Sequence, residues 1–304
     1  MQAMARERGI FFLSADFGSP VLDELVRRHA DRFVNVGIAE QNLINVAAGL
    51  ALEGFTVFAY AIAPFLSMRC YEQIRVNLAL LSQLRPLNVN LIGVGAGYSY
   101  DVSGPSHQAL EDLCILRVLP NLEVFSPADW VSAAAFVPHA LNTPRPKYIR
   151  LDGKALPALY PAPTALRVER GFEELLRGRD LCLVATGCMT HSALAVARQI
   201  QPRGLAIGVV DLFLLKQPDE TALLETLRRY PRLLTLEEGF VGKGGLDMLI
   251  LELLRRHRCV LPVETVGIPD RYGFEVGSRE RHHRLNGMSE ADLLERIGAY
   301  VQRS

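Results

Sequence analysis

Residues 33–54 read FVNVGIAEQNLINVAAGLALEG, and this stretch decides the fold class. Its first four residues favour a strand, and an apolar helical pattern runs from 39 to 52 before Gly54 ends it. A strand that turns directly into a helix is typical of a parallel α/β sheet, where ligand sites gather at strand ends. Glu40 stands on the first helical turn. Because first-turn acids often only complement the helix dipole, spacing alone favours a structural role for it.

The same alternation of short strands and longer helices continues on both sides. In the first half we expect helices at 39–52, 65–81, 108–116 and 130–141, and strands at 10–15, 33–36, 56–61, 88–94, 122–125 and 148–151. In the second half we expect helices at 192–200, 221–230, 246–257 and 290–301, and strands at 181–185, 206–210, 233–236 and 263–266. This predicts an α/β fold with two parallel-sheet domains. Three prolines between 157 and 163 mark the connection, so the expected units are residues 1–153, a linker at 154–165, and residues 166–304.

Composition narrows the function classes. The chain has 33 Lys and Arg against 33 Asp and Glu, a balance that argues against a nucleic-acid-binding protein. The five cysteines are scattered, which makes a disulfide framework or a zinc site unexpected. The uncharged run 54–68 contains Pro64 and is shorter than the roughly 20 residues of a membrane helix. With no secretory signal recognised, we expect a cytoplasmic protein without a membrane partner.

Two further segments follow Glu40 in order. Residues 63–73, APFLSMRCYEQ, place positions 65, 68 and 71 near one helical face, which alone is typical of an ordinary core helix. Residues 93–108, GVGAGYSYDVSGPSHQ, form a glycine-rich loop after a strand, but without dinucleotide-binding spacing. His107 near the end of that loop is a candidate catalytic residue, although lone histidines are often structural.

Together these segments resemble the pyrimidine-binding half of transketolases and deoxyxylulose phosphate synthases. The resemblance implies that Glu40 is catalytic and hydrogen-bonds the aminopyrimidine ring of thiamine diphosphate, activating the cofactor by proton exchange. It implies that Phe65 and Tyr71 flank this ring, with Met68 where many transketolases carry a stacking phenylalanine. The residue that matches the family's substrate-facing histidine is His107.

The resemblance extends through the second half in the segments 119–129, 236–246 and 266–273. The G-D-G…N-N motif that binds the diphosphate through a divalent metal is not found in the sequence. We therefore expect one half of a split transketolase, with the diphosphate and its magnesium ion (Mg2+) held mainly by an N-terminal diphosphate-binding transketolase subunit. The resemblance implies an α2β2 heterotetramer that acts on sugars or sugar phosphates.

Several departures from the family pattern concern the substrate. The position of one transketolase histidine aligns near Gly95, and that of an acidic residue aligns with Ser103, for which Asp101 is a possible substitute. Arg150 and Lys154 are the candidate cations for a substrate phosphate, which arginine usually binds in bidentate fashion. Specialised or surface-sugar biosynthesis therefore fits at least as well as a pentose phosphate role.

Two alternatives stay open from the sequence. The chain could be the β subunit of a 2-oxo acid dehydrogenase complex, which shares the two-domain plan, or a non-catalytic subunit that has kept the fold. The basic segment 279–284 is interpreted as solvated surface. The adjacent Glu237 and Glu238 should point to opposite faces of their strand, so they are unsuited to paired-acid catalysis.

Overall fold

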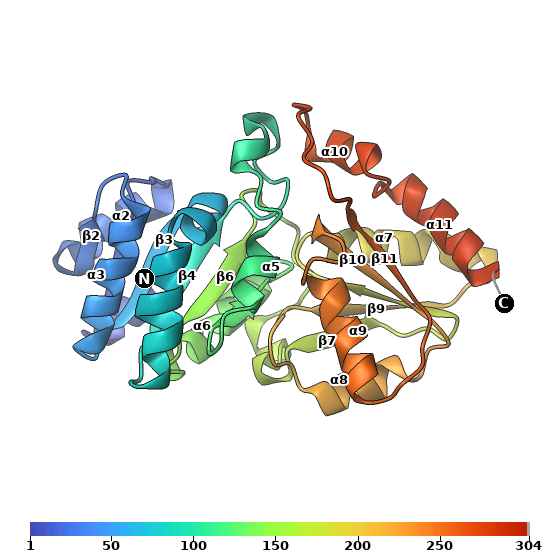
Figure 1. Cartoon of the computed structure of the whole chain (residues 1–304), viewed down its shortest axis with the longest axis horizontal. Helices are drawn as coiled ribbons and strands as arrows, with labels where there is room; N and C mark the ends of the chain where they lie inside the picture. The colour runs from blue at the N-terminus through green and yellow to red at the C-terminus, as the bar shows by residue number, and fades with distance from the viewer. Residues whose placement is uncertain (303–304) are drawn as a thin grey trace.

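The computed structural model describes residues 1–302, which fold into two α/β domains lying side by side (Figure 1). The first domain is built on a six-stranded sheet of order β2-β1-β3-β4-β6-β5 in which every pairing is parallel. Its strands are β1 (Ile10–Ser14), β2 (Phe33–Asn35), β3 (Thr56–Ile62), β4 (Val89–Val94), β5 (Glu123–Phe125) and β6 (Lys147–Leu151).

Helices cover this sheet because their apolar positions recur on one side. In α3, the buried Leu43, Ile44 and Ala47 share one core with Val57 and Ala59 of β3. The helices of this domain are α1 (Gln2–Arg6), α2 (Pro20–His29), α3 (Glu40–Leu52), α4 (Tyr71–Gln73), α5 (Asp112–Arg117) and α6 (Trp130–Asn142). Two π-helical segments, Phe65–Arg69 and Ile74–Leu80, lie on either side of α4.

The second domain contains a five-stranded sheet of order β11-β10-β8-β9-β7. Its pairings are parallel except at the edge, where β7 runs antiparallel to β9. The strands are β7 (Phe172–Leu176), β8 (Leu181–Ala185), β9 (Ile207–Leu212), β10 (Leu233–Phe240) and β11 (Val263–Ile268). The helices are α7 (Met189–Ile200), α8 (Glu220–Leu227), α9 (Leu246–Arg256), α10 (Arg279–Leu285) and α11 (Glu290–Gln302). The predicted fold class is confirmed.

The sequence analysis missed α1, α2, β7 and α10, and it did not anticipate the winding of the helix expected at 65–81. That stretch is helical throughout most of its length, but it is wound largely as π-helix instead of α-helix. A π-turn holds one residue more than an α-turn, so side chains that share a face by α-helical spacing are rotated apart.

The proline-rich connection between the domains is packed against both of them. The buried Tyr160 donates its hydroxyl hydrogen to Oδ2 of Asp211 at 2.6 Å. The backbone N–H groups of Leu159 and Tyr160 donate to Oδ2 of Asp129 at 2.6 and 3.2 Å. The same Asp129 caps α6 by accepting from the backbone N–H of Ser132. The domain limits inferred from the sequence stay predictions.

Within residues 1–302, we find no helix that combines the length and the apolar character needed to cross a bilayer.

Candidate active site

Glu40 begins α3 at the carboxyl end of β2, as the sequence predicts for a ligand site in a parallel sheet. Its side chain is buried, with the residue only 5% exposed. Its Oε2 accepts a charge-assisted hydrogen bond from Nη1 of Arg69 at 2.7 Å. A carboxylate that is almost excluded from water is unusual unless it is paired, and here the cation comes from the neighbouring π-helical segment.

Arg69 also links Glu40 to the predicted aromatic and histidine residues. Its guanidinium carbon lies over the ring of Phe65, 4.5 Å from the ring centroid. The ring of Phe65 in turn meets that of His107 edge-on, with 5.2 Å between centroids. Nδ1 of His107 lies 3.0 Å from Oγ of Ser106. The structure therefore brings Glu40, Phe65 and His107 into one group, which we call the pyrimidine group, joined by an arginine that the sequence did not indicate.

Arg69 was missed because the sequence analysis compared Phe65 only with Met68 and Tyr71. Arg69 follows Phe65 by four residues, and its guanidinium lies over that ring. Met68 is 40% exposed, and the hydroxyl of Tyr71 donates to the backbone carbonyl of Ile115 in α5 at 3.0 Å. The structure does not join these two residues to the pyrimidine group, and their cofactor role stays a prediction.

The glycine-rich loop is built around an aromatic ring at the position of the missing transketolase histidine. Gly95 has a φ of +105°, and a Cβ added there would lie 2.3 Å from the ring of Tyr100. A side chain at position 95 is therefore excluded by backbone conformation and by the neighbouring ring together. The alignment of the histidine position with Gly95 has a structural basis in this packing.

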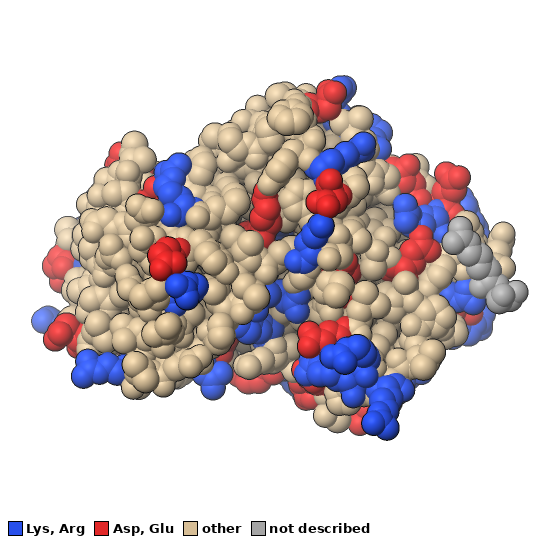
Figure 2. Space-filling model, in the orientation of Figure 1, with Lys and Arg blue, Asp and Glu red and all other residues tan. Residues whose placement is uncertain are grey.

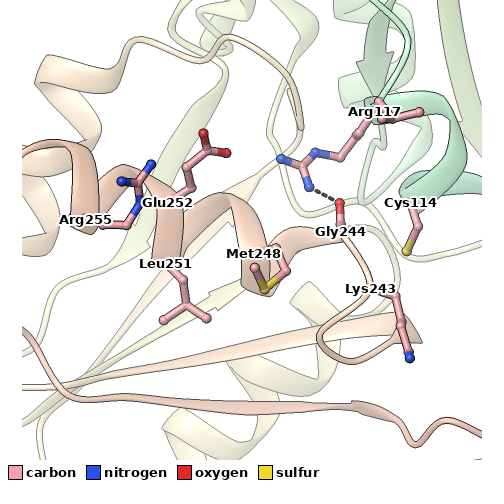
Figure 3. Close-up of a pocket in the computed structure, with 9 residues that line it drawn as sticks. Cys114, Arg117, Lys243, Gly244, Met248, Leu251, Glu252 and Arg255 are labelled. Carbon is pink, nitrogen blue, oxygen red and sulfur yellow. Dashed lines mark hydrogen bonds between the residues drawn. The ribbon is translucent and has the colours of Figure 1, made fainter.

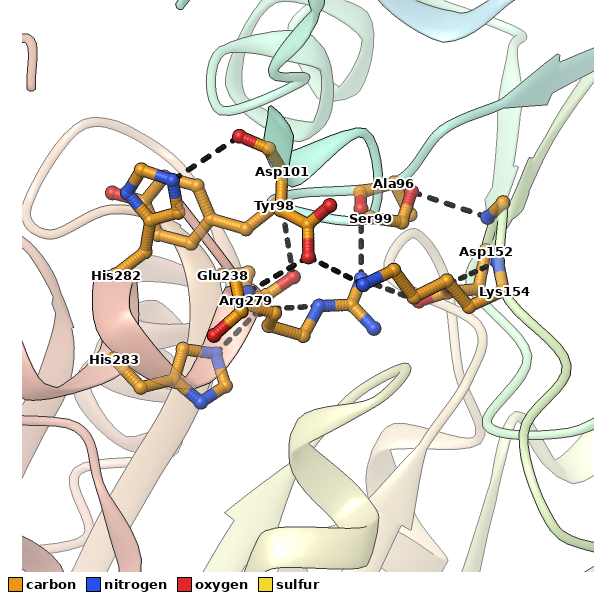
Figure 4. Close-up of polar contacts among 12 residues, drawn as sticks. Ala96, Tyr98, Ser99, Asp101, Asp152, Lys154, Glu238, Arg279, His282 and His283 are labelled. Carbon is orange, nitrogen blue, oxygen red and sulfur yellow. Dashed lines mark hydrogen bonds and ion pairs between the residues drawn. The ribbon is translucent and has the colours of Figure 1, made fainter. Parts of the chain in front are cut away.

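The predicted substrate residues Asp101 and Lys154 form an ion pair at the mouth of this loop (Figure 4). Oδ2 of Asp101 also accepts from the backbone N–H of Arg279 at 2.9 Å. Burial alone would raise the pKa of Asp101, but the hydrogen bonds from Lys154 and Arg279 outweigh it and lower that pKa. Ser103 is exposed in the same loop. The structure thus brings Asp101 and Lys154 together, apart from the contacts of the pyrimidine group.

The interpretation of 279–284 as solvated surface was wrong, because this segment forms α10 and its inner side is buried. Nη2 of Arg279 donates to Oδ2 of Asp152 at 2.7 Å, and its Nε lies 3.1 Å from Oε1 of Glu238. The ring of His282 stacks on Tyr98 with 4.6 Å between centroids (Figure 4). The basic residues at 279 and 282 are buried because acidic and aromatic partners from distant strands and loops face them, and sequence spacing does not reveal such partners.

Glu238, on β10, anchors the loop that ends at His107. Its Oε2 accepts from the backbone N–H of Tyr98 at 3.0 Å, and its Oε1 lies 2.5 Å from Nε2 of His283. Burial alone would raise the pKa of Glu238, but the charge of Arg279 and the hydrogen bond from His283 lower that pKa to about 2. The adjacent Glu237 instead contacts the backbone N–H of Asp247 at the start of α9, so the two acids serve opposite sides of the strand.

This pKa predicts an acid-sensitive stability. Because folding lowers the pKa of Glu238, its contribution is present above the unfolded value near pH 4.3 and is lost as the pH falls toward 2, by about 3 kcal/mol. Urea unfolding at pH 6 and pH 3 should therefore show a smaller pH dependence for Glu238→Gln than for the wild type. Glu72→Gln, which removes an exposed carboxylate on α4, is the control and should keep the wild-type dependence. Identical pH slopes for Glu238→Gln and the wild type would contradict the pairing.

Arg150 is placed in the protein interior, with its side chain only 3% exposed. Its Nε donates to Oδ2 of Asp112 at 2.8 Å, and its Nη2 donates to the backbone carbonyls of Ala109 and Glu238 at 2.8 and 3.0 Å. The hydroxyl of Tyr148 donates to the same Asp112 oxygen at 2.7 Å. These contacts favour a structural role for Arg150, holding the two domains together, over the predicted contact with a substrate phosphate.

Comparison with known protein families agrees with this geometry. Residues 1–158 match the family model of the transketolase pyrimidine binding domain, and residues 172–293 match that of the transketolase C-terminal domain. The chain belongs to the transketolase family. The sequence-based recognition of the pyrimidine-binding and C-terminal half of a transketolase is confirmed, and the chain is a transketolase-like transferase subunit.

Similar proteins include other split transketolases. One of the subunits of the apulose-4-phosphate transketolase of Actinobacillus succinogenes is 30% identical over 271 residues, which cover 88% of this chain and 85% of that protein. The 6-deoxy-6-sulfo-D-fructose transketolase subunit SqwH of a Clostridium species is 31% identical over 273 residues, covering 90% and 82%. A solved structure described as "Split gene transketolase, inactive beta4 tetramer" is 34% identical, with a TM-score of 0.86 and coverage of 99% and 94%. These relatives favour the transketolase interpretation over a 2-oxo acid dehydrogenase subunit.

The residues of the pyrimidine group fit the aminopyrimidine half of the transketolase cofactor. A buried carboxylate at a helix start and an aromatic face lie next to each other, and the side chain between them is a half-exposed arginine. Within residues 1–302, no cluster of three or more His, Cys, Asp or Glu side chains has an arrangement that could hold a metal ion. The chain therefore offers groups for the ring of the cofactor.

A cavity of about 440 Å³ lies elsewhere, between α5 and α9 (Figure 3). Arg117 closes one side of it by donating to the backbone carbonyl of Gly244, which connects the two domains. Its lining residues include none of the residues predicted for the transketolase site.

Proposed function

We propose that this chain is the β subunit of a thiamine diphosphate-dependent transketolase that transfers a two-carbon ketol unit between sugars. The observation that carries the proposal is the pyrimidine group, in which the buried Glu40 lies at a strand end beside Phe65 and His107. The family membership of the chain supports the same reaction.

Each residue of the group has a distinct part in this proposal. When bound, thiamine diphosphate supplies the nucleophilic carbon that carries the two-carbon unit. Glu40 holds and exchanges a proton at the aminopyrimidine ring nitrogen, and burial keeps water from competing for that carboxyl group. Phe65 offers an apolar face to the planar ring. His107, oriented by Ser106, donates a hydrogen bond to the oxygen of the donor carbonyl.

The partner in this proposal docks on the first domain around Glu40. Large apolar side chains are exposed next to Glu40, at the start of the helical run 65–83 and in the glycine-rich loop, namely Ile38 (78%), Met68 (40%) and Val102 (69%). Figure 1 shows α3 next to that helical run, and in Figure 2 the surface over these helices is mostly uncharged. A surface with exposed apolar residues and few charges is typical of a protein–protein interface core.

An N-terminal diphosphate-binding transketolase subunit fits this surface best, because it would bring the diphosphate and Mg2+ sites that complete the cofactor site. The solved relative that consists of β chains alone is described as inactive, which agrees with this division of labour. We therefore propose an α2β2 heterotetramer acting in carbohydrate metabolism in the cytoplasm.

The substrate in this proposal is a sugar or sugar phosphate outside the pentose phosphate route. The loop lacks the histidine at Gly95, and the interior position of Arg150 leaves Lys154, paired with Asp101, as the half-exposed cation near the loop. The relatives named for apulose-4-phosphate and 6-deoxy-6-sulfo-D-fructose act on unusual sugars, which supports a specialised or surface-sugar role.

Reconstitution tests this function directly. The chain should be mixed with a G-D-G…N-N subunit from a neighbouring reading frame, together with thiamine diphosphate and Mg2+, and supplied with a panel of ketose donors and aldose acceptors. We expect two-carbon transfer from the mixture and none from either subunit alone. Decarboxylation of 2-oxo acids without ketol transfer would instead support the dehydrogenase alternative.

His107→Ala in the reconstituted enzyme should lower the turnover number by roughly 10- to 100-fold, the usual loss for one hydrogen bond to a developing charge. Cofactor affinity should change little, because the role proposed for His107 concerns the donor sugar. Steady-state kinetics with the preferred donor, together with calorimetric titration of thiamine diphosphate, separates the two quantities. His257→Ala, a surface change on the C-terminal side of α9, is the control. A His107 variant with full turnover would remove this residue from the site.

A further inference from the structure

The sequence analysis assigned no role to Arg69, yet this residue contacts two of the three residues in the pyrimidine group, Glu40 and Phe65. It bonds Oε2 of Glu40 at 2.7 Å and lies 4.5 Å above the centroid of Phe65. Its backbone carbonyl accepts from Nε2 of Gln41 at 3.1 Å, so the backbone at this position is held against α3. Its side chain is 47% exposed, in contrast to the nearly buried carboxylate that it contacts. The guanidinium is therefore the outer and more mobile member of the pair.

The two contacts of the guanidinium are chemically the ones expected of an aminopyrimidine ring. Both groups are planar and carry N–H donors at their edge, both can bond a carboxylate in their own plane, and both can stack on an aromatic face. In this chain the carboxylate and the aromatic face that would serve the ring, Glu40 and Phe65, are already engaged by Arg69. The ring and the guanidinium would thus compete for the same two partners.

We propose that Arg69 is a placeholder for the cofactor: it occupies the Glu40–Phe65 pair in the unloaded subunit and moves outward when thiamine diphosphate binds. This inference rests on the proposed function. It explains how a carboxylate can stay buried before the cofactor arrives, since the arginine provides the countercharge. This arrangement lowers the apparent affinity for the cofactor, because thiamine diphosphate must displace Arg69 from Glu40 and Phe65.

The π-helical segment supports an outward movement of this side chain. Arg69 is the last residue of that segment and is followed by Cys70, whose backbone leaves the helical conformation with φ −105° and ψ 15°. The neighbouring Leu66, Ser67 and Cys70 are buried, so the backbone stays fixed and the change is confined to the arginine rotamer. Side-chain rotation at an exposed position needs no rearrangement of the core.

The test is calorimetric titration of thiamine diphosphate, with Mg2+ present, into the reconstituted assembly. For Arg69→Met we expect the dissociation constant to fall by about fivefold, the size of effect that one half-exposed ion pair produces. Arg69→Lys keeps the charge but loses the planar stack on Phe65, so its dissociation constant should lie between those of the wild type and Arg69→Met. Arg256→Met, which removes a half-exposed cation paired with Glu220 in the second domain, should bind as the wild type does.

An unchanged or raised dissociation constant in Arg69→Met would overturn the proposal, since a raised value would mean that the arginine positions Glu40 in the loaded state. If the reconstituted wild-type assembly did not bind thiamine diphosphate at all, the proposed function itself would be refuted, and this inference with it. The unfolding midpoint of each variant, measured on the same preparations, shows that the fold is intact.

Discussion

Glu40→Gln should lower the turnover number of the reconstituted enzyme by roughly 1,000-fold, within the range that loss of a general acid–base group produces. Glutamine has nearly the same shape, and its amide oxygen can still accept the hydrogen bond from Nη1 of Arg69. It cannot take up and release a proton, and proton exchange at the ring nitrogen is the role proposed for this residue. The fold should be retained, because the substituted side chain still fills its buried position.

The measurement is steady-state two-carbon transfer at saturating thiamine diphosphate, so that a change in cofactor affinity does not hide a change in turnover. Glu53→Gln, an exposed residue at the other end of α3, is the matched control and should keep full activity. Undiminished turnover in Glu40→Gln, with the cofactor bound, would falsify the assignment of Glu40.

Arg150→Met should destabilise the protein by about 3–5 kcal/mol, because it leaves the carboxylate of Asp112 buried without its cation. Two backbone carbonyls, those of Ala109 and Glu238, would lose their donor at the same time. Since one of these carbonyls belongs to β10 and the other to the first domain, the loss should weaken the contact between the domains. Urea unfolding followed by fluorescence and by circular dichroism measures both the free energy and any separation of the two domain transitions.

Arg145→Met is the control for this change, since its guanidinium is half exposed and lies 4.0 Å from Glu123. It should alter the free energy of unfolding by less than about 1 kcal/mol. Adding Asp112→Asn to Arg150→Met should recover part of the loss, because asparagine is uncharged and still accepts from the hydroxyl of Tyr148. If Arg150→Met proved as mild as the control, the interior role would be wrong and contact with a substrate phosphate would again be open.

The parts of the fold that follow from local pattern could be predicted from the sequence. The strand–helix unit around Glu40 appears as expected because a strand of β-prone residues, a glycine turn and an apolar helical face all lie within residues 33–54. The same holds for most other helices and strands, whose apolar periodicity depends only on neighbours in the chain.

The parts that were missed depend on contacts between distant residues. The basic residues of α10 look like a solvated surface until two acids are placed against them: Asp152 from the first domain and Glu238 from β10. The role of Arg69 was missed because its carboxylate partner, Glu40, is 29 residues away in the chain and belongs to another helix.

The tight packing of Tyr100 against Gly95 also bears on how such a subunit can evolve. A mutation that introduces histidine at position 95 would meet both an unfavourable backbone conformation and an occupied volume. The two positions are therefore coupled: a smaller residue at 100 would relieve only the steric part of the cost of a side chain at 95, and the backbone part would remain. A histidine-bearing loop is thus not reached from this chain by one substitution without damage to the loop.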